Sequence, residues 1–157
     1  MSGVYKIVAL SDIHHDIAKV HRIMPIINAS DYLVFCGDGL NDLMSIRGEI
    51  TVPIVCVKGN NDWNTSVAEM SCITLGETRV LITHGHRQDV RRGLGGLIAA
   101  AKLKNCRLVF FGHTHTPYDL IYDGIHLINP GAISGHGSYA LVMGDGINFT
   151  CKHETVE

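Results

Sequence analysis

Five short polar motifs contain most of the residues in this 157-residue chain whose types and spacing could do chemistry. Each motif directly follows a run of apolar, β-prone residues. Their side chains offer carboxylate oxygens, an amide oxygen and imidazole nitrogens without a thiolate, a donor set that suits a divalent transition metal. The pattern predicts a metal centre assembled from several strand ends. The motifs are Asp12-Ile13-His14, Gly37-Asp38, Gly59-Asn60-Asn61-Asp62, His84-Gly85-His86 and Gly112-His113-Thr114-His115.

The apolar runs before the motifs predict strands that alternate with helices. Near-continuous apolar strands of this kind are typical of a parallel sheet that is buried on both faces, and ligands bind beyond the carboxyl ends of such strands. Pro25 falls inside the first helical pattern and should kink or split that helix. The expected strands cover residues 4–10, 32–36, 54–57, 78–83 and 107–111, and the expected helices cover 17–27, a short segment around 43–46, and 90–101.

The remainder of the chain, from Tyr118 onward, contains short apolar runs separated by turn signals such as Asp123-Gly124 and Gly144-Asp145-Gly146. These runs predict antiparallel strands. With 46% hydrophobic and 18% charged residues, and with no linker or low-complexity tract, residues 1–157 have the length and composition of a single domain.

Taken singly, each motif also has an ordinary structural explanation. Asp12 could cap a helix, Asp38 between two glycines suits a tight turn, and the segment 59–62 suits another turn. His113 and His115 could be a buried pair whose rings bond to carbonyl groups. In extended backbone, however, residues two apart face the same side, so each pair could contribute two ligands to one site. The five motifs together favour that hypothesis.

The combined set provides two carboxylates, one amide and four imidazoles, which is enough for two metals with Asp38 shared between them. Mixed oxygen and nitrogen donors without a thiolate suit Mn²⁺, Fe²⁺, Ni²⁺, Co²⁺ or Zn²⁺ rather than Mg²⁺ or Ca²⁺. Two such metals about 3.5–4 Å apart lower the pKa of a bridging water and hold the attacking and leaving oxygens at phosphorus. The expected chemistry is phosphoester hydrolysis. The candidate ligands are Asp12, His14, Asp38, Asn60, His84, His113 and His115.

The motif order D-x-H, G-D, G-N-H-[DE], H and G-H-x-H resembles that of the calcineurin-like metallophosphoesterases. The short length, the start at Ser11-Asp12 and the element Asn129-Pro130-Gly131 are most similar to the small phosphodiesterases of the YfcE type, whose subfold the retromer subunit VPS29 shares. The resemblance implies a four-layer αββα sandwich, an α/β (α+β) fold with two mixed sheets flanked by helices. It also implies a metal-bridging hydroxide that attacks a small phosphodiester.

By the same resemblance, one metal would be held by Asp12, His14, Asp38 and His115, and the other by Asp38, Asn60, His84 and His113. The chain departs from the family pattern at Asn61, where the family has a histidine. An amide cannot be a general acid, but the small phosphodiesterase subgroup also lacks that histidine, and His86, His15 or Asp62 could assist instead. The expected catalytic residues are Asp38, Asn60 and His86.

Residues near the motifs have less specific interpretations. Asn61 and Asp62 are suited to shaping the turn around Asn60, and Trp63 could form a wall of the substrate pocket or pack against the fold. Three arginines could attract phosphate, although such clusters are commonly solvated. They are Arg87, Arg91 and Arg92.

Two other classes of function stay open for this sequence. One is a VPS29-like scaffold that binds partner proteins and retains metals, which the intact ligand set disfavours. The other is a phosphomonoesterase or a nucleotide pyrophosphohydrolase, and the missing histidine disfavours the general monoesterase.

Charge and hydrophobicity limit the expected partners. The formal net charge of −2 argues against duplex nucleic acid or an anionic membrane as a partner, and leaves a small phosphodiester. Residues 1–6 enter a strand pattern and no apolar stretch reaches about 20 residues, so we expect a cytoplasmic protein. The five cysteines show no close-paired spacing and are expected to be reduced. A homo-oligomer that forms through exposed apolar edges is a further expectation.

Overall fold

The computed structural model describes residues 4–157, which form two five-stranded mixed sheets with a few short helices. Sheet A has the strand order β10-β9-β1-β2-β3 and sheet B the order β4-β5-β6-β8-β7. The strands of sheet A are β1 (Tyr5–Leu10), β2 (Tyr32–Phe35), β3 (Ile54–Cys56), β9 (Ser138–Gly144) and β10 (Phe149–Thr155). Those of sheet B are β4 (Met70–Leu75), β5 (Thr78–Thr83), β6 (Leu108–Phe110), β7 (Tyr118–Tyr122) and β8 (Ile125–Asn129).

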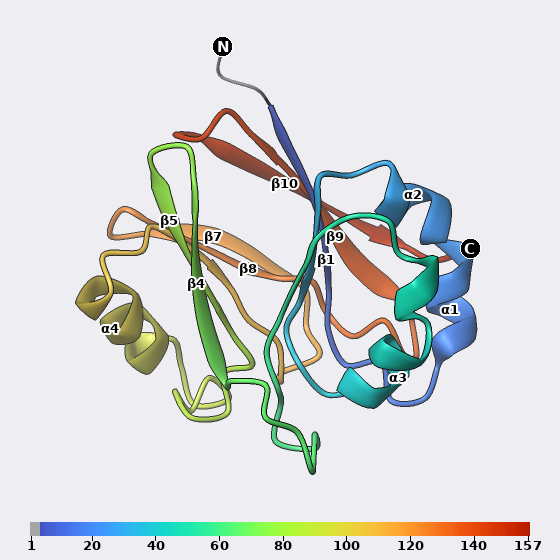
Figure 1. Cartoon of the computed structure of the whole chain (residues 1–157). Coiled ribbons are helices and arrows are strands. Elements are labelled where there is room, and N and C mark those ends of the chain that lie inside the picture. The colour runs from blue at the N-terminus through green and yellow to red at the C-terminus, as the bar shows by residue number, and fades with distance from the viewer. Residues whose placement is uncertain (1–3) are drawn as a thin grey trace.

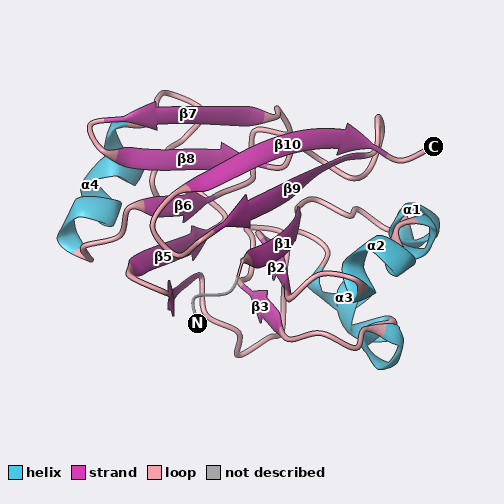
Figure 2. Ribbon diagram, turned by 90° about the horizontal axis from the view of Figure 1, so that it is seen from above, coloured by secondary structure: helices cyan, strands magenta, loops and turns pink. Residues whose placement is uncertain are grey.

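The helices cover the outer faces of the two sheets, which gives the αββα sandwich that the family resemblance implies (Figures 1 and 2). Three short helices lie against sheet A, namely α1 (Ile17–Arg22), α2 (Met24–Asn28) and α3 (Leu40–Ser45), and a 3₁₀ turn at Arg47–Glu49 follows them. Helix α4 (Gly95–Leu103) lies against sheet B. Within residues 4–157, no helix combines the length and the apolar character needed to cross a bilayer.

The main core lies between the two sheets, because both sheets turn an apolar face inward. Ile7 and Val34 from sheet A pack in one cluster with Ile82 and Phe110 from sheet B, and all four are fully or almost fully buried. Two further clusters join each sheet to its own helices. Strands with both faces buried read as continuous apolar runs, which is why the sequence indicated them clearly.

The expectation of one parallel sheet is corrected by this arrangement. Strands β1, β2 and β3 are parallel in sheet A, and β5, β6 and β8 are parallel in sheet B. The strands expected at 4–10, 32–36 and 54–57 therefore lie in sheet A, and those expected at 78–83 and 107–111 lie in sheet B. Antiparallel pairs complete both sheets, with β9 and β10 beside β1, β4 beside β5, and β7 beside β8.

Two local expectations also change. The helix expected over 90–101 begins only at Gly95, because residues 86–92 form turns and Gly93 has a φ of +151°. Strand β4 was not expected, because its polar residues interrupt the apolar pattern. The expected break at Pro25 is confirmed, since α1 ends at Arg22 and Pro25 lies in the first turn of α2, where a missing N–H costs nothing.

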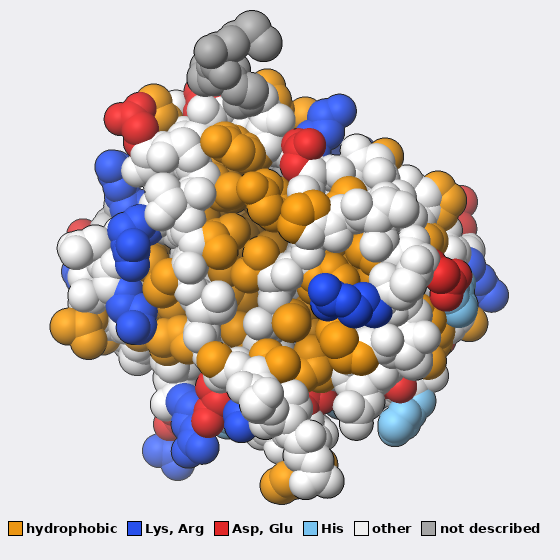
Figure 3. All heavy atoms as spheres, viewed as in Figure 1, with side chains coloured by type: hydrophobic (Ala, Val, Ile, Leu, Met, Phe, Trp, Pro, Cys, Tyr) orange, Lys and Arg blue, Asp and Glu red, His pale blue; other side chains and the backbone are white. Residues whose placement is uncertain are grey.

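The edges of the two sheets leave part of the core near the surface. Strands β3 and β4 are edge strands of sheets A and B, respectively. Val55 and Ile73 on these strands pack against the intersheet core but are only partly buried. Figure 3 shows hydrophobic side chains gathered in a band on this face of the molecule.

Truncating Phe110 should weaken the whole sandwich, because its side chain is fully buried between the sheets. We expect Phe110→Ala to lower the free energy of unfolding by about 3–5 kcal/mol. Leu103→Ala is the control, since Leu103 is 84% exposed, and it should change the free energy by less than about 0.5 kcal/mol. Urea unfolding curves of the three proteins measure both effects, and equal midpoints would contradict the assigned core.

Candidate metal centre

The predicted ligands come together where the two sheets meet. The ends of β1, β2 and β3 provide Asp12, Asp38 and the Gly59 loop from sheet A, and those of β5 and β6 provide His84 and His113 from sheet B. Side chains of the two sheets lie within hydrogen-bonding distance of each other here. The site is therefore a junction between the two sheets.

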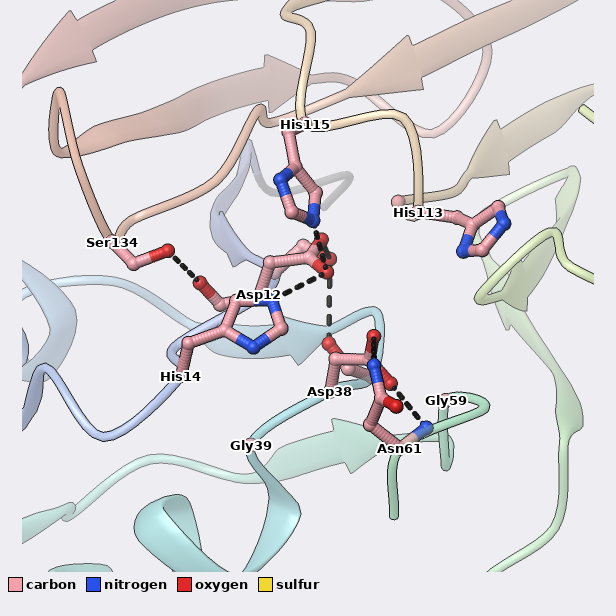
Figure 4. Close-up of polar contacts among 12 residues, drawn as sticks. Asp12, His14, Asp38, Gly39, Gly59, Asn61, His113, His115 and Ser134 are labelled. Carbon is pink, nitrogen blue, oxygen red and sulfur yellow. Dashed lines mark hydrogen bonds and ion pairs between the residues drawn. The ribbon is translucent and has the colours of Figure 1, made fainter. Parts of the chain in front are cut away.

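One group of donors surrounds the buried carboxylate of Asp12. Its Oδ1 atom lies 3.4 Å from Nε2 of His14 and 3.1 Å from Nε2 of His115. The Ser11 hydroxyl donates to Oδ2. Oδ1 is buried and has no hydrogen-bond partner among residues 4–157, which is unusual for a carboxylate oxygen. Figure 4 shows both imidazole rings turned toward this carboxylate.

A second group of donors consists of Asp12, Asp38 and His84, all of them buried. The Nδ1 atom of His84 lies 2.7 Å from the carbonyl oxygen of Cys36. Because a carbonyl can only accept, Nδ1 carries the proton and donates it, a backbone contact typical of metal-binding histidines. The Nε2 atom then faces the site, 3.3 Å from Oδ2 of Asp38 and 3.2 Å from Nδ1 of His113.

The electrostatics of this second group favour an ionised Asp38. Burial raises the pKa of Asp38, but the hydrogen bond and charge of His84 and two hydrogen bonds from Asn61 outweigh it, so the pKa lies well below its usual range. Burial lowers the pKa of His84, whereas the hydrogen bond to Asp38 and the carboxylate charges raise it on balance. Burial and the nearby charge of His84 lower the pKa of His113. An anionic carboxylate and a neutral imidazole are the forms that bind metals. These shifts therefore favour the binding forms of Asp38 and His113, whereas a metal at His84 would have to displace a proton.

The backbone at the motifs is left-handed, so the expectation of extended geometry was wrong. Residues two apart still contribute to one site, but they do so through tight loops. A φ between +20° and +160° costs a residue other than glycine roughly 1–2 kcal/mol, and such strain clusters at functional sites. Five predicted ligands have a positive φ in this range, namely Asp12 (φ 56°), His14 (44°), Asp38 (64°), His113 (70°) and His115 (65°).

Two motif glycines are required by the close approach of the loops. A Cβ atom at Gly59 would lie 2.1 Å from Oδ1 of Asp38, and one at Gly112 would lie 2.1 Å from the hydroxyl of Ser11. Neither position has room for a side chain. The loops after β1, β2, β3 and β6 therefore pack against one another directly, which brings the ligands within range.

Asn61 and Asp62 hold these loops together, which confirms the expectation that they shape the turn. The backbone N–H and the side-chain amide of Asn61 donate to the two oxygens of Asp38, each at 2.9 Å (Figure 4). The Asp62 carboxylate accepts four backbone N–H groups, from Asp38, Gly39, Leu40 and Gly59, at 2.8–3.0 Å. One carboxylate thus ties the loop after β2 to the loop after β3.

Asn60 and His86 lie at the margin of the cluster. Asn60 is exposed and, in the described part of the chain, makes no hydrogen bond to the other predicted ligands. The ring of His86 lies 5.4 Å from that of His84 and 6.2 Å from that of His113. Its Nε2 atom is 3.1 Å from Oε2 of Glu69, and its buried Nδ1 has no partner among residues 4–157.

Several supporting residues were missed by sequence reasoning. Glu69 contacts both His86 and Arg87, but no motif includes it. Ser11 precedes a predicted ligand, and a small polar residue at that position could have indicated its role. Asn129, in the Asn-Pro-Gly element, donates from Nδ2 to the carbonyl of Gly112 and to the Thr114 hydroxyl at 3.1 and 3.0 Å, which supports the last motif.

The residues present fit a metal centre. The buried, unpartnered Oδ1 of Asp12 faces two imidazole nitrogens, and a cation would satisfy all three donors. Asp12 is common to both donor groups. The two oxygens of Asp38, in contrast, both accept hydrogen bonds from Asn61. With cations bound, this donor set would supply the Lewis-acid chemistry that polarises an anionic oxygen substrate.

Comparison with known proteins supports this interpretation. Residues 5–145 match the model of the calcineurin-like phosphoesterase superfamily domain. A probable metallophosphoesterase of Bacillus subtilis is 29% identical over 103 residues, which cover 66% of this chain and 59% of that protein. A probable metallophosphoesterase of Mycoplasma pneumoniae is 28% identical over 82% of this chain and 79% of its own length. The chain thus spans less than two thirds of the Bacillus protein.

Solved structures share the whole fold. A predicted phosphoesterase from Streptococcus pneumoniae has a TM-score of 0.84 at 27% identity and covers 99% of this chain and 91% of its own. A zinc complex of Vps29 from Entamoeba histolytica has a TM-score of 0.74 at 16% identity, with 97% and 99% of the two chains covered, and is similar in fold alone.

This chain belongs to the calcineurin-like phosphoesterase superfamily. Its candidate metal-binding residues lie together at the junction of the two sheets.

Replacing Asp62 should damage both stability and metal binding, because its two oxygens each accept two backbone N–H groups. In Asp62→Asn an NH₂ group would face two of these donors. We expect a loss of at least about 2 kcal/mol in the free energy of unfolding, since unsatisfied buried donors cost about 1–3 kcal/mol each.

The control for this variant is Asp42→Asn, because Asp42 accepts one exposed backbone hydrogen bond, from His15. Urea unfolding measures stability and atomic absorption measures bound Mn²⁺ in both variants. If Asp62→Asn were as stable as Asp42→Asn and bound as much metal, Asp62 would not be holding the loops.

Proposed function

We propose that this protein hydrolyses small phosphodiesters at a centre for two divalent transition metals, with Mn²⁺ as the expected cation. The observation that carries the proposal is the buried Oδ1 of Asp12, which faces His14 and His115 without a hydrogen-bond partner among residues 4–157. It lies in a chain of the phosphoesterase superfamily. A buried acceptor of this kind is costly unless a cation neutralises it.

Each proposed ligand has a place in one of two sets. Asp12, His14 and His115 would hold one cation, and Asp38, His84 and His113 would hold the other. Asn60 lies exposed beside Gly59, where its amide oxygen can complete the second set. By family resemblance Asp38 would contribute to both sets, and in this structure Asp12 is the carboxylate that adjoins both donor groups.

When bound, the two cations would lower the pKa of an attacking water and neutralise charge on the phosphate oxygens. The protein's own residues set the geometry for this chemistry. The Cys36 carbonyl fixes the tautomer of His84, and Asn61 fixes the orientation of Asp38. Because these supports are backbone groups or short side chains, the donors are preorganised before the substrate arrives.

Proton delivery to the leaving group is the weak part of this site. Asn61 stands where the family has a histidine, and its amide donates to Asp38. His86 lies beside His84 and His113, but its Nε2 atom is paired with Glu69. The leaving group must therefore depart largely as an anion, which favours acidic alcohols such as phenols.

Loss of a ligand should abolish activity and metal binding together. We expect Asp38→Asn and His113→Ala to reduce kcat/KM for bis-p-nitrophenyl phosphate by at least about 100-fold, beyond the 10–100-fold typical of a residue that only supports a ligand. Bound Mn²⁺, counted by atomic absorption, should fall as well. Asp16→Asn is the control, because the ion pair of Asp16 within residues 4–157 is with Lys19, away from the predicted ligands.

Full activity in both ligand variants would refute the metal assignment. A wild-type protein that binds two metals but hydrolyses neither diesters nor monoesters would instead support the scaffold alternative. A preference for p-nitrophenyl phosphate over the diester would favour a monoesterase.

The proposed lack of a general acid predicts a strong dependence on the leaving group. A positioned acid usually contributes about 10²–10⁴-fold, so methyl phosphodiesters should be hydrolysed at least about 100-fold more slowly than p-nitrophenyl phosphodiesters. Asn61→His should restore the missing donor and narrow this ratio, whereas Asn61→Gln should not. Steady-state kinetics with both substrates measure the ratio, and similar rates for the two in the wild-type protein would count against the idea.

A further inference from the structure

Two cavities adjoin the metal centre, one beside each donor group. The first has a volume of about 610 Å³, and His115 of the Asp12 group contributes to its wall. The second has a volume of about 380 Å³ and lies beside Asn60 and His86, next to the Asp38 group. A phosphodiester carries two alcohol substituents, and a site that cuts it needs room for one on each side of the phosphorus.

The wall of the 380 Å³ cavity includes a large aromatic side chain that is exposed to solvent instead of packed in the core. Trp63, the single tryptophan of the chain, lines this cavity and is 73% exposed. Tryptophan is normally well buried, because its large ring gains most from leaving water. An indole exposed beside an anion-binding site is a stacking surface for an aromatic ligand.

Cationic groups stand in the same cavity. Arg87 donates to both oxygens of Glu69, at 2.7 and 3.3 Å, so the carboxylate holds the guanidinium in place while its side chain stays 70% exposed. Lys58 also lines the cavity. Two carboxylates also line the cavity, and both have partners: four backbone N–H groups donate to Asp62, and Arg87 pairs with Glu69. An aromatic group that carries phosphate matches this combination.

We propose that the Trp63 cavity binds the nucleobase of a nucleotide-containing phosphodiester by stacking on the indole ring, with Arg87 beside the sugar-phosphate part. The other substituent of the diester occupies the 610 Å³ cavity next to His115. The volume of 380 Å³ lies within the range of small-ligand pockets. This assignment rests on the proposed phosphodiesterase function and names its substrate class.

Because Trp63 is the only tryptophan, its fluorescence reports on this cavity alone. The Mn²⁺-loaded protein is titrated with adenosine 5′-monophosphate, with ribose 5-phosphate and with phenyl phosphate, and the fluorescence is excited at about 295 nm, where the indole absorbs and the base does not. We expect saturable quenching by the adenine nucleotide. Ribose 5-phosphate, which has the same phosphate and sugar without the base, should bind more weakly by about 5- to 100-fold, the loss expected for one stacked base.

Equal affinity for these two ligands, or no change in fluorescence, would overturn the assignment. Phenyl phosphate distinguishes a simple aryl pocket from a nucleotide pocket. If phenyl phosphate bound as tightly as the nucleotide, the cavity would accept aromatic groups in general and the nucleotide assignment would be wrong.

Variants separate stacking from folding. Trp63→Ala should raise KM for thymidine 5′-(p-nitrophenyl phosphate) at least about 5-fold with little change in kcat, and Trp63→Phe should restore most of the loss. Arg87→Ala should weaken binding of the adenine nucleotide at least about 5-fold. Arg92→Ala is the matched control and should have no effect, because Arg92 is 87% exposed and lies outside the cavity.

The binding titration does not depend on catalysis, so the two proposals can fail separately. If the nucleotide quenched the fluorescence of a protein without phosphodiesterase activity, nucleobase binding in the Trp63 cavity would be supported and the proposed function would be refuted. Hydrolysis of bis-p-nitrophenyl phosphate without quenching would support the function and refute the nucleotide cavity.

Discussion

The carboxylate of Asp62 is the contact on which the geometry of the site depends. It accepts backbone N–H groups from the loop after β2 and from the loop after β3, and no other side chain in the described structure joins these loops in this way. Hydrogen bonds to a charged acceptor are roughly twice as strong as neutral ones. They hold Asp38 in its left-handed conformation and bring Asn61 against its oxygens.

The junction between the sheets is the second constraint. Sheet A contributes Asp12 and Asp38, and sheet B contributes His84, His113 and His115. Neither sheet alone holds a complete donor set, so the relative position of the sheets decides whether the donors meet. That position is set by the intersheet core, in which side chains of both sheets interdigitate. Packing far from the cluster therefore controls its geometry.

This arrangement requires strained backbone at the ligands and glycine at two positions of the loops. The left-handed ligand residues each cost free energy, and Gly59 and Gly112 sit where no Cβ atom fits. The same close approach of the loops leaves Oδ1 of Asp12 buried and facing two imidazoles. A cation bound between them would offset part of this cost, so metal binding and the stability of the loops should be linked.

The sequence by itself determined the strands that precede the ligands, because both faces of those strands are buried and their apolar runs are continuous. It also showed which residues could be ligands and in which order they occur, because Asp, Asn and His side chains that can bind a metal follow these strands. Only the tertiary structure decided which strands join which of the two sheets, that the ligand loops are left-handed, and that Glu69 supports His86 and Arg87. Periodicity reports which face of a strand is buried, not which partner covers it, and left-handed loops aim side chains by contacts between segments distant in the sequence.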